Sequence, residues 1–299
     1  MNNLLNDTAE TFTMKAIGNC KRALISGVTS ARDVGARYAI NILIAKETAS
    51  GAIAGPRIIA AGEWLQMPGT WPSALTQLIE TPEDLGAAVK KQIEIGAGLI
   101  KIGSTGFHPN GEQFASMTPE ALSVAVHTAH DAGLRIAAHC VGFEGTKNSV
   151  EAGIDSIEHG TFIDEETVKL MVEKGTYLVP TLSTWDARLR LSKELNLSQK
   201  EIGEVEHLKE NSQASFRRAY KAGVRIASGT DAGGSPARHG FFAREIELMV
   251  ETGMSPVEAL ESATRVAADL LGIQDHVGTI EVNKQADLVL IDGDPHSDP

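Results

Sequence analysis

The sequence lacks several features that would assign the protein to a specialised class. It has only two cysteines, Cys20 and Cys140, in 299 residues, so no disulfide framework is predicted. No apolar segment reaches the length of a membrane span, and no basic run offsets the formal net charge of −12. These absences argue against a membrane or nucleic-acid partner. Residues 1–10 also lack the basic and apolar blocks of a secretory signal, so we expect a cytoplasmic protein.

What is present is an alternation of strand-like and helix-like segments. Hydrophobic residues make up 42% of the chain and charged residues 22%, as in an ordinary globular protein. Short apolar runs beginning near residues 28, 57, 99, 135, 155, 176 and 224 are separated by segments with helical spacing. No linker or low-complexity segment divides the chain. This order predicts an α/β fold with parallel strands covered by helices.

Two of these strands end in the same way. Residues 135–139 read Arg-Ile-Ala-Ala-His139, and residues 155–159 read Asp-Ser-Ile-Glu-His159, with a helix-length segment between them. In a parallel β/α arrangement the carboxyl ends of neighbouring strands meet on one face. His139 and His159 are therefore candidates to bind one cation, although each alone could also be a half-buried structural histidine.

Two further strand candidates end in residues that suit the same chemistry. Lys101 follows Gly-Ala-Gly-Leu-Ile, and Asp231 follows Ala-Ser-Gly-Thr. Imidazole and carboxylate are ligands of zinc and similar divalent ions. A lysine that has reacted with CO₂ becomes an anionic oxygen ligand, and an aspartate can accept a proton from an attacking water.

Each of these residues also has a purely structural interpretation. Lys101 could be an ion-paired lysine at a strand end, and Asp231 a turn or cap residue. His127 and His130 are three apart on a predicted helix, away from the strand ends, and are interpreted as surface or packing residues. Cys140 is interpreted as a small buried residue and not a nucleophile.

The motifs together resemble those of a known family. The order of strand-Lys, strand-His, strand-His and strand-Asp resembles the amidohydrolase superfamily of metal-dependent hydrolases. The resemblance is to the branch with imidazolonepropionase-like proteins and prolidase-type dipeptidases. It extends from about residue 21 to residue 292 and includes the motifs Ile-Lys101-Ile, Ala-Ala-His139, Glu-His159-Gly-Thr, Tyr-Leu-Val-Pro-Thr-Leu and Gly-Thr-Asp231-Ala-Gly.

The resemblance implies a (β/α)8 TIM-type barrel in residues 1–272. Residues 273–299 would hold the C-terminal strand of a small β-domain, at about 286–292, and a tail. It implies one or two divalent ions, with zinc expected. Lys101 would be the N-carboxylated ligand, His139 and His159 the paired histidines, and Asp231 a ligand and the general acid/base. His239, on the loop after Asp231, is a candidate substrate contact; the alternative is an ordinary surface histidine.

One departure from the family pattern concerns the first metal. The first barrel strand of the family carries a His-x-His pair, and no His-x-His occurs in this sequence. We therefore expect a barrel without its first strand, a chain shortened at its N-terminus, and about one tightly bound ion. Self-association as a homo-oligomer is one way to cover the strand edges that this leaves.

Three hypotheses for function follow. The first is a metal-dependent hydrolase of amide, cyclic amide or dipeptide bonds in small molecules. The second is a non-catalytic or weakly active remnant that keeps the fold and binds metal. The third is a lyase in which Lys101 forms a Schiff base. Chelator sensitivity separates the first hypothesis from the second, and borohydride trapping with a carbonyl substrate separates the third from both.

Overall fold

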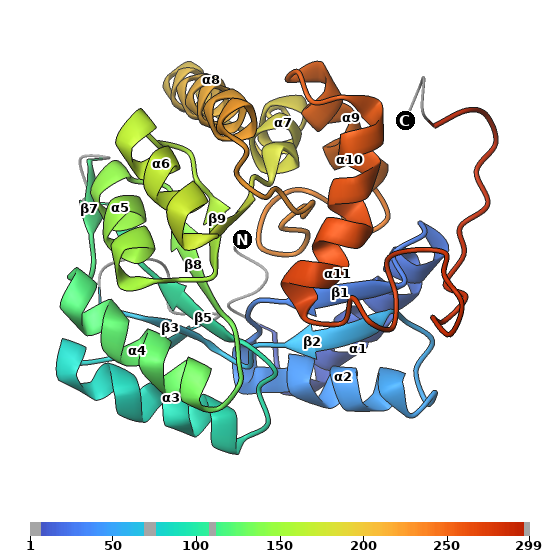
Figure 1. Cartoon of the computed structure of the whole chain (residues 1–299), viewed down its shortest axis with the longest axis horizontal. Coiled ribbons are helices and arrows are strands. Elements are labelled where there is room, and N and C mark those ends of the chain that lie inside the picture. Colours follow the sequence, from blue (N-terminus) through green and yellow to red (C-terminus); the bar gives the residue numbers. More distant parts are fainter. Residues whose placement is uncertain (1–6, 69–75, 108–111, 296–299) are drawn as a thin grey trace. The chain divides into compact units, whose positions relative to one another are not determined.

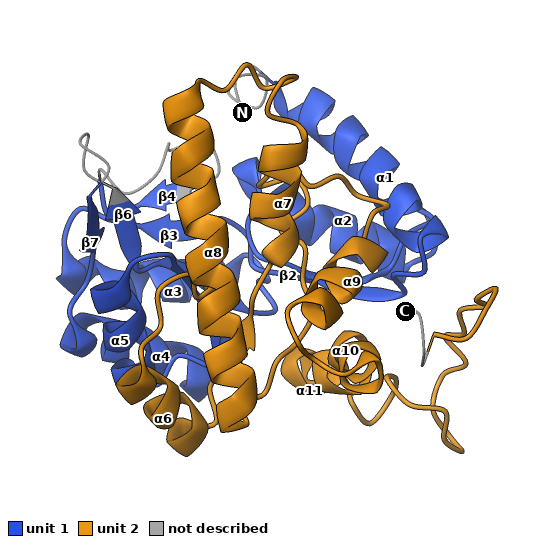
Figure 2. Ribbon diagram, turned by 90° about the horizontal axis from the view of Figure 1, so that it is seen from above, with its two compact units in different colours: residues 1–157 blue, residues 158–299 orange. Residues whose placement is uncertain are grey.

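The computed structural model describes residues 7–68, 76–107 and 112–295. The chain divides into two compact units, residues 1–157 and residues 158–299, drawn in blue and orange in Figure 2. The division falls within one strand, β9 (Ser156–His159). Strands alternate with helices along most of the chain (Figure 1), which confirms the predicted α/β class.

Unit 1 contains most of the strands. Its elements in chain order are α1 (Ala9–Ile25), β1 (Ser30–Asp33), the 3-10 helix Arg37–Ala39, α2 (Ile40–Ala49), β2 (Arg57–Ala60), β3 (Trp64–Gln66), β4 (Thr76–Leu78), the 3-10 helix Pro82–Asp84, α3 (Leu85–Glu94), β5 (Ile100–Gly103), β6 (Thr105–Phe107), β7 (Gln113–Ala115), α4 (Pro119–Asp131), β8 (Ile136–Cys140), α5 (Phe143–Ala152) and the first part of β9.

The strands of unit 1 pair mainly in parallel. Within the unit the order is β8-β5-β3-β4, with Lys101 opposite Ala137 and Leu65 opposite Ile102. β1 and β2 form a separate parallel pair, and β6 and β7 an antiparallel hairpin. Every residue of β5 and β8 is buried. Burial of both faces explains why these strands read as nearly continuous apolar runs and not as an alternating pattern.

Helix boundaries in unit 1 follow local signals. Thr118 accepts a hydrogen bond from the Ala121 amide at the start of α4, and Pro119 occupies the first helical position. α5 ends at Gly153, which has a left-handed backbone. The helices α3, α4 and α5 lie next to one another in sequence order (Figure 1). The apolar residues of the sheet and of these helices form the interior of the unit.

Unit 2 is mostly helical. After β9 its elements are α6 (Glu165–Lys174), β10 (Tyr177–Val179), α7 (Leu182–Arg190), α8 (Gln199–Ala222), α9 (Ala243–Glu251), α10 (Pro256–Ala263) and α11 (Arg265–Leu271).

In the interior of unit 2, β10 packs against α11. Tyr177, Val179, Ala227 and Leu270 form a buried apolar cluster. The predicted strand at residues 224–231 is reduced to one parallel bridge between Leu178 and Ile226, because only two ladder hydrogen bonds form there. The polar, charged sequence of residues 185–221 predicts one long helix or two, and the structure has two helices there, α7 and α8.

The sequence of residues 63–73, rich in turn residues and large aromatics, predicts a loop. The structure differs, because Trp64–Gln66 form β3 with partners in β5 and β4 that local sequence does not reveal. Residues 69–73 of that loop, including Trp71, lie outside the described residues. Residues 255–272 have the spacing of one helix, but the structure forms two, α10 and α11, with a break at Thr264, where ψ is −90°.

The strand expected at residues 286–292 is also absent. The segment is irregular, and its apolar side chains are exposed, Leu290 completely so. A strand needs a neighbour for its backbone donors and acceptors, and no described segment pairs with this one. Among the helices of the described ranges, none is both long and apolar enough to span a lipid bilayer.

Candidate functional site

Lys101 and His139 lie on neighbouring strands of unit 1. Lys101 is the second residue of β5, and Gly103 at its end is opposite His139 near the end of β8. Both side chains are buried, with exposed fractions of 3% for Lys101 and 6% for His139. Burial of a lysine at such a position is unusual unless its amine is engaged. The structure therefore brings together these two predicted site residues.

The indole of Trp64 contacts both residues and was not singled out by the sequence. Its ring centroid lies 5.0 Å from that of His139, with the planes tilted by 38°. The Lys101 Nζ lies 5.8 Å from the centroid of the Trp64 ring, within the range of a cation–π contact. One sequence signal could have identified Trp64: it is a large aromatic residue that follows closely after the predicted strand near residue 57 and Gly62.

His159 ends β9 and is the first predicted site residue of unit 2. Its backbone is left-handed, with φ of 71°, and its side chain is 8% exposed. The Nδ1 atom lies 2.6 Å from the Thr181 hydroxyl oxygen. A hydrogen bond of this kind to one ring nitrogen fixes the orientation of a metal-binding histidine and directs the other nitrogen. Thr181 is thus a functional candidate that the sequence analysis missed.

Asp231 follows the extended segment after α8 and also has a left-handed backbone, with φ of 53°. Its carbonyl oxygen accepts hydrogen bonds from the Gly234 and Ser235 amides, at 3.2 and 3.0 Å. A β-carbon placed on Gly234 would lie 2.6 Å from the Asp231 Oδ1, so a larger residue at position 234 would displace the carboxylate. His239 is on the same loop, and its Nε2 approaches Gly233.

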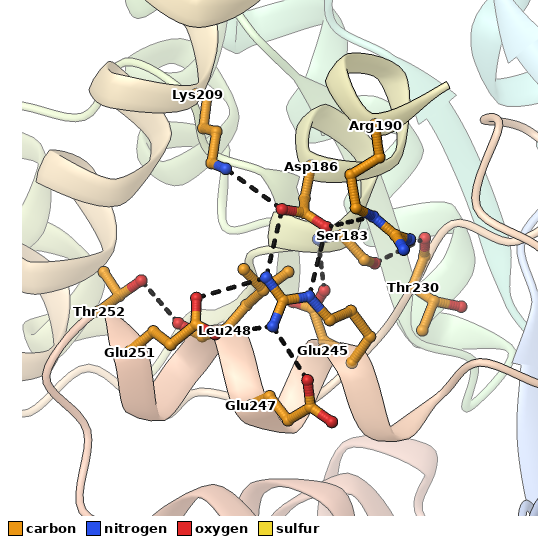
Figure 3. A network of polar contacts seen from close by, with 11 residues as sticks. Ser183, Asp186, Arg190, Lys209, Thr230, Glu245, Glu247, Leu248, Glu251 and Thr252 are labelled. Carbon is orange, nitrogen blue, oxygen red and sulfur yellow. Dashed lines mark hydrogen bonds and ion pairs between the residues drawn. The ribbon is translucent and has the colours of Figure 1, made fainter. Parts of the chain in front are cut away.

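A buried carboxylate connects the surroundings of His159 and Asp231. Glu245 on α9 is completely buried and accepts hydrogen bonds from the amides of Leu182 and Ser183, at 2.8 and 2.7 Å. The Ser183 hydroxyl donates to the Thr230 carbonyl oxygen at 3.3 Å, directly before Asp231. Burial raises the pKa of Glu245 to about 7. Figure 3 shows this carboxylate beneath the first turn of α7.

An ionic network adjoins Glu245 and joins α7 to α8 and α9. Asp186 is bound by Arg190, Lys209 and Arg244, with nitrogen–oxygen distances of 3.0, 3.2 and 3.3 Å (Figure 3). Burial alone would raise the pKa of Asp186, but the hydrogen bonds and charges of Arg244 and Lys209 hold it below its ordinary value. The network therefore ties the middle of α7 to α8 and α9.

The other histidines and the cysteine considered in the sequence have structural roles. His127 is exposed, and its Nδ1 lies 2.6 Å from the Ser123 carbonyl oxygen of the same helix. His130 contacts Asp155 at 2.9 Å, and the same carboxylate accepts from the Ile136 amide. Cys140 is completely buried. Each residue therefore lies where it was expected, His127 and His130 on the surface of a helix and Cys140 in the interior.

The donor chemistry of the site residues suits a divalent ion. In the part of the chain that the structure describes, no three histidine, cysteine, aspartate or glutamate side chains gather as a metal-binding group. Lysine is outside that set of donors, and the predicted ligands divide between the units, with Lys101 and His139 in unit 1 and His159 and Asp231 in unit 2. His159 nevertheless has the hydrogen-bonded Nδ1 typical of a ligand.

A match to the amidohydrolase family covers residues 3–299. The chain belongs to the amidohydrolase family.

Individual relatives agree with this assignment. Ochratoxinase from Aspergillus niger is 31% identical over 310 residues, covering 93% of this chain and 63% of that protein. A crystal structure of a Xaa-Pro dipeptidase with bound methionine is 34% identical and superposes with a TM-score of 0.89, covering 98% of this chain and 76% of that one. A prolidase complexed with N-methylphosphonate-L-proline is 27% identical, with a TM-score of 0.88 and coverages of 99% and 76%. The chain therefore spans somewhat less than two thirds of the ochratoxinase it matches.

Proposed function

We propose that the protein is a metal-dependent hydrolase of amide bonds in small molecules, with dipeptides and N-acyl amino acids as the substrate class. The observation that carries the proposal is the position of the motif residues. Lys101 and His139 lie on adjacent parallel strands, and His159 and Asp231 occupy left-handed positions that end extended segments. Non-glycine residues in such conformations are costly and gather at functional sites. The similarity to a Xaa-Pro dipeptidase and to ochratoxinase supports the substrate class.

In this proposal the residues have separate roles. Lys101, His139, His159 and Asp231 would hold a divalent ion, with zinc expected and Lys101 carboxylated. The ion, when bound, supplies Lewis-acid polarisation of the scissile carbonyl. Asp231 accepts a proton from the attacking water and returns it to the leaving nitrogen.

Three further side chains have proposed roles beside these. Thr181 holds the ring of His159 in one orientation through the contact with Nδ1. Trp64 covers the side chains of Lys101 and His139 and keeps bulk water from them. His239, on the loop of Asp231, is proposed to contact substrate.

The test is a hydrolysis assay on Xaa-Pro dipeptides, N-acyl amino acids and small cyclic amides, with zinc or manganese and bicarbonate. Asp231→Asn retains the size and an oxygen donor of Asp231 but cannot accept the proton. Turnover should fall by about 10²- to 10⁴-fold, while bound metal falls far less.

The matched control is Asp275→Asn, which changes an exposed aspartate of the same unit and should leave turnover unchanged. Equal rates for the wild-type protein and Asp231→Asn on every substrate of the panel would remove Asp231 from the mechanism. A wild-type protein without activity on the panel would favour the non-catalytic hypothesis.

A further inference from the structure

The start of α7 has an unusual cap. Helices commonly begin with a threonine whose hydroxyl accepts a backbone amide of the first turn. Thr181 occupies that position, but its side chain makes no capping hydrogen bond, and its hydroxyl contacts His159 instead. The amides of Leu182 and Ser183 are bound by the two carboxylate oxygens of Glu245, which is 62 residues further along the chain from Ser183. The Glu245 carboxylate thus caps the helix in place of the Thr181 hydroxyl, which contacts His159.

The backbone of Thr181 is also unusual for a residue that begins a helix. Thr181 is left-handed, with φ of 46°, which is unfavourable for a β-branched residue. Ordinary capping geometry places the cap residue in the extended region. A threonine held in this conformation needs support from its surroundings, and the next two amides after Thr181 are both fixed by Glu245.

We propose that Glu245 is a positioning residue, which anchors the first turn of α7 so that Thr181 orients His159 and Ser183 holds the backbone that precedes Asp231. The inference rests on the proposed function for the roles of His159 and Asp231. Its evidence is a continuous series of contacts within unit 2. One branch runs from Glu245 through Leu182 to Thr181 and His159, and the other from Glu245 through Ser183 to Thr230.

The location of Glu245 fits an anchor better than an ordinary cap. The carboxylate is inaccessible to solvent, whereas the hydroxyl caps of α4 and α8 lie at the surface. Both of its oxygens accept an amide, which is possible only for a group with two acceptors. Burial raises its pKa to about 7, so the protein bears the cost of a desolvated acid at this position. Asp186 on α7 is the neighbouring charge that adds to this effect, and it is itself neutralised by Arg244 and Lys209.

The test uses Glu245→Gln, which keeps the shape of the side chain but replaces one acceptor with an amide donor facing an N–H group. The matched control is Glu247→Gln, two residues further along α9, which removes a half-exposed carboxylate bound to Arg244. The first readout is the ring resonance of His159 in the metal-free protein, observed with ¹³C-labelled histidine and assigned with His159→Gln. Glu245→Gln should displace this resonance, and Glu247→Gln should not.

A second pair of variants tests the route of the effect. Thr181→Val removes the hydroxyl and should displace the His159 resonance, whereas Thr181→Ser retains the hydroxyl and should preserve it. If Glu245 acts through Thr181, the double variant Glu245→Gln/Thr181→Val should differ little from Thr181→Val alone. Additive displacements would contradict the proposed route.

The functional readouts are metal affinity and the separate kinetic constants. Loss of a group that orients a ligand typically reduces metal affinity or activity by about 10- to 100-fold, and we expect the lower end because Glu245 acts through Thr181. The fall should be in kcat, with KM changed by no more than about twofold, since Glu245 does not contact substrate. If Glu245→Gln does not fold, Glu245→Asp retains the charge while withdrawing the carboxylate, and is measured in the same way.

The outcomes separate this inference from the proposed function. An unchanged His159 resonance in a folded Glu245 variant, with only a lower Tm, would overturn the inference and make Glu245 a structural cap. The resonance requires neither metal nor substrate, so it remains decisive even if the wild-type protein hydrolyses nothing on the panel. Conversely, wild-type hydrolysis with an unchanged resonance would leave the proposed function intact.

Discussion

At the scale of single residues, Gly103 shows how closely Trp64 is fitted to the strand that bears Lys101. A β-carbon on Gly103 would lie 2.7 Å from the Trp64 Nε1 and 3.2 Å from the Gln66 Cβ. The first distance is shorter than van der Waals contact allows, and the position is buried within paired strands. Glycine at residue 103 is therefore what permits the indole to lie against Lys101 and His139.

Gly103→Ala should consequently displace Trp64 and destabilise the protein. Overpacking of a well-packed interior costs about 1–3 kcal/mol, and we expect the free energy of unfolding in urea to fall by that amount. The control is Gly203→Ala in α8, where nothing lies within 4 Å of the added β-carbon. That variant should be about 0.5–1 kcal/mol more stable, because alanine favours a helix. Equal stabilities for the two variants would show that Trp64 adapts freely.

At the scale of elements, the three helices α7, α8 and α9 are joined by Asp186. Its side chain is 5% exposed, while Lys209 and Arg244 are 28% and 26% exposed. Three positively charged side chains surround this one carboxylate, so its removal leaves their positive charge without its main counter-charge. The Arg244 guanidinium also binds Glu247 and Glu251, so part of the network remains without Asp186.

Asp186→Asn should lower the free energy of unfolding by about 2 kcal/mol at pH 7, the order expected for hydrogen bonds to a charged group. The pKa of Asp186 is lowered in the folded protein, so its contribution is complete above the ordinary aspartate pKa of about 3.9. The contribution is lost as the pH falls through the depressed value. The difference between wild-type and Asp186→Asn should therefore shrink in strong acid.

The comparison for this prediction is again Glu247→Gln. Glu247 is 44% exposed, and an exposed ion pair contributes only a few tenths of a kcal/mol. Urea titrations of both variants at pH 7 and at pH 3 or below would reveal the difference. A pH-independent effect of Asp186→Asn would indicate that shape, and not charge, is what the network requires.

At the scale of the whole molecule, local sequence signals predicted most helices, whereas the strands depend on pairing between segments that are far apart in the sequence. Thr118-Pro119 and Gly153 fixed the ends of α4 and α5, because caps act within one turn of their residue. β3 was missed because it becomes a strand by pairing with β5 and β4. Residues 286–292 were wrongly predicted as a strand, since among the described residues no segment pairs with them.

For the candidate site, too, some residues could be found from the sequence and others only from the structure. Lys101, His139, His159 and Asp231 were selected because each ends an apolar run, and chain order alone supplies that information. Thr181 lies in the motif Tyr-Leu-Val-Pro-Thr-Leu but was given no role, and Glu245 lies in none of the motifs. Their contacts join His159 to a residue 22 positions away and α7 to a residue more than 60 positions away. Only the folded chain reveals such partners.

The metal content remains the central prediction for the molecule as a whole. We expect about one divalent ion per chain, because the proposed imidazole ligands His139 and His159 are present while the His-x-His pair does not occur in the sequence. His139→Ala should reduce bound zinc severely, and exposed His127→Ala on α4 should not. Elemental analysis of purified protein measures both. Two ions per chain, or equal zinc in the two variants, would contradict the single-ion expectation.

The exposed segment at residues 286–292 has a consequence for behaviour in solution. Four consecutive apolar residues, Leu288 to Ile291, are each more than half exposed, and Asp287 and Asp292 flank them. A short β-prone run of this kind is a template for intermolecular strand addition, and flanking charges act as gatekeepers against it. We therefore expect the resistance of the folded protein to aggregation to depend on two carboxylates that belong neither to its core nor to its proposed site.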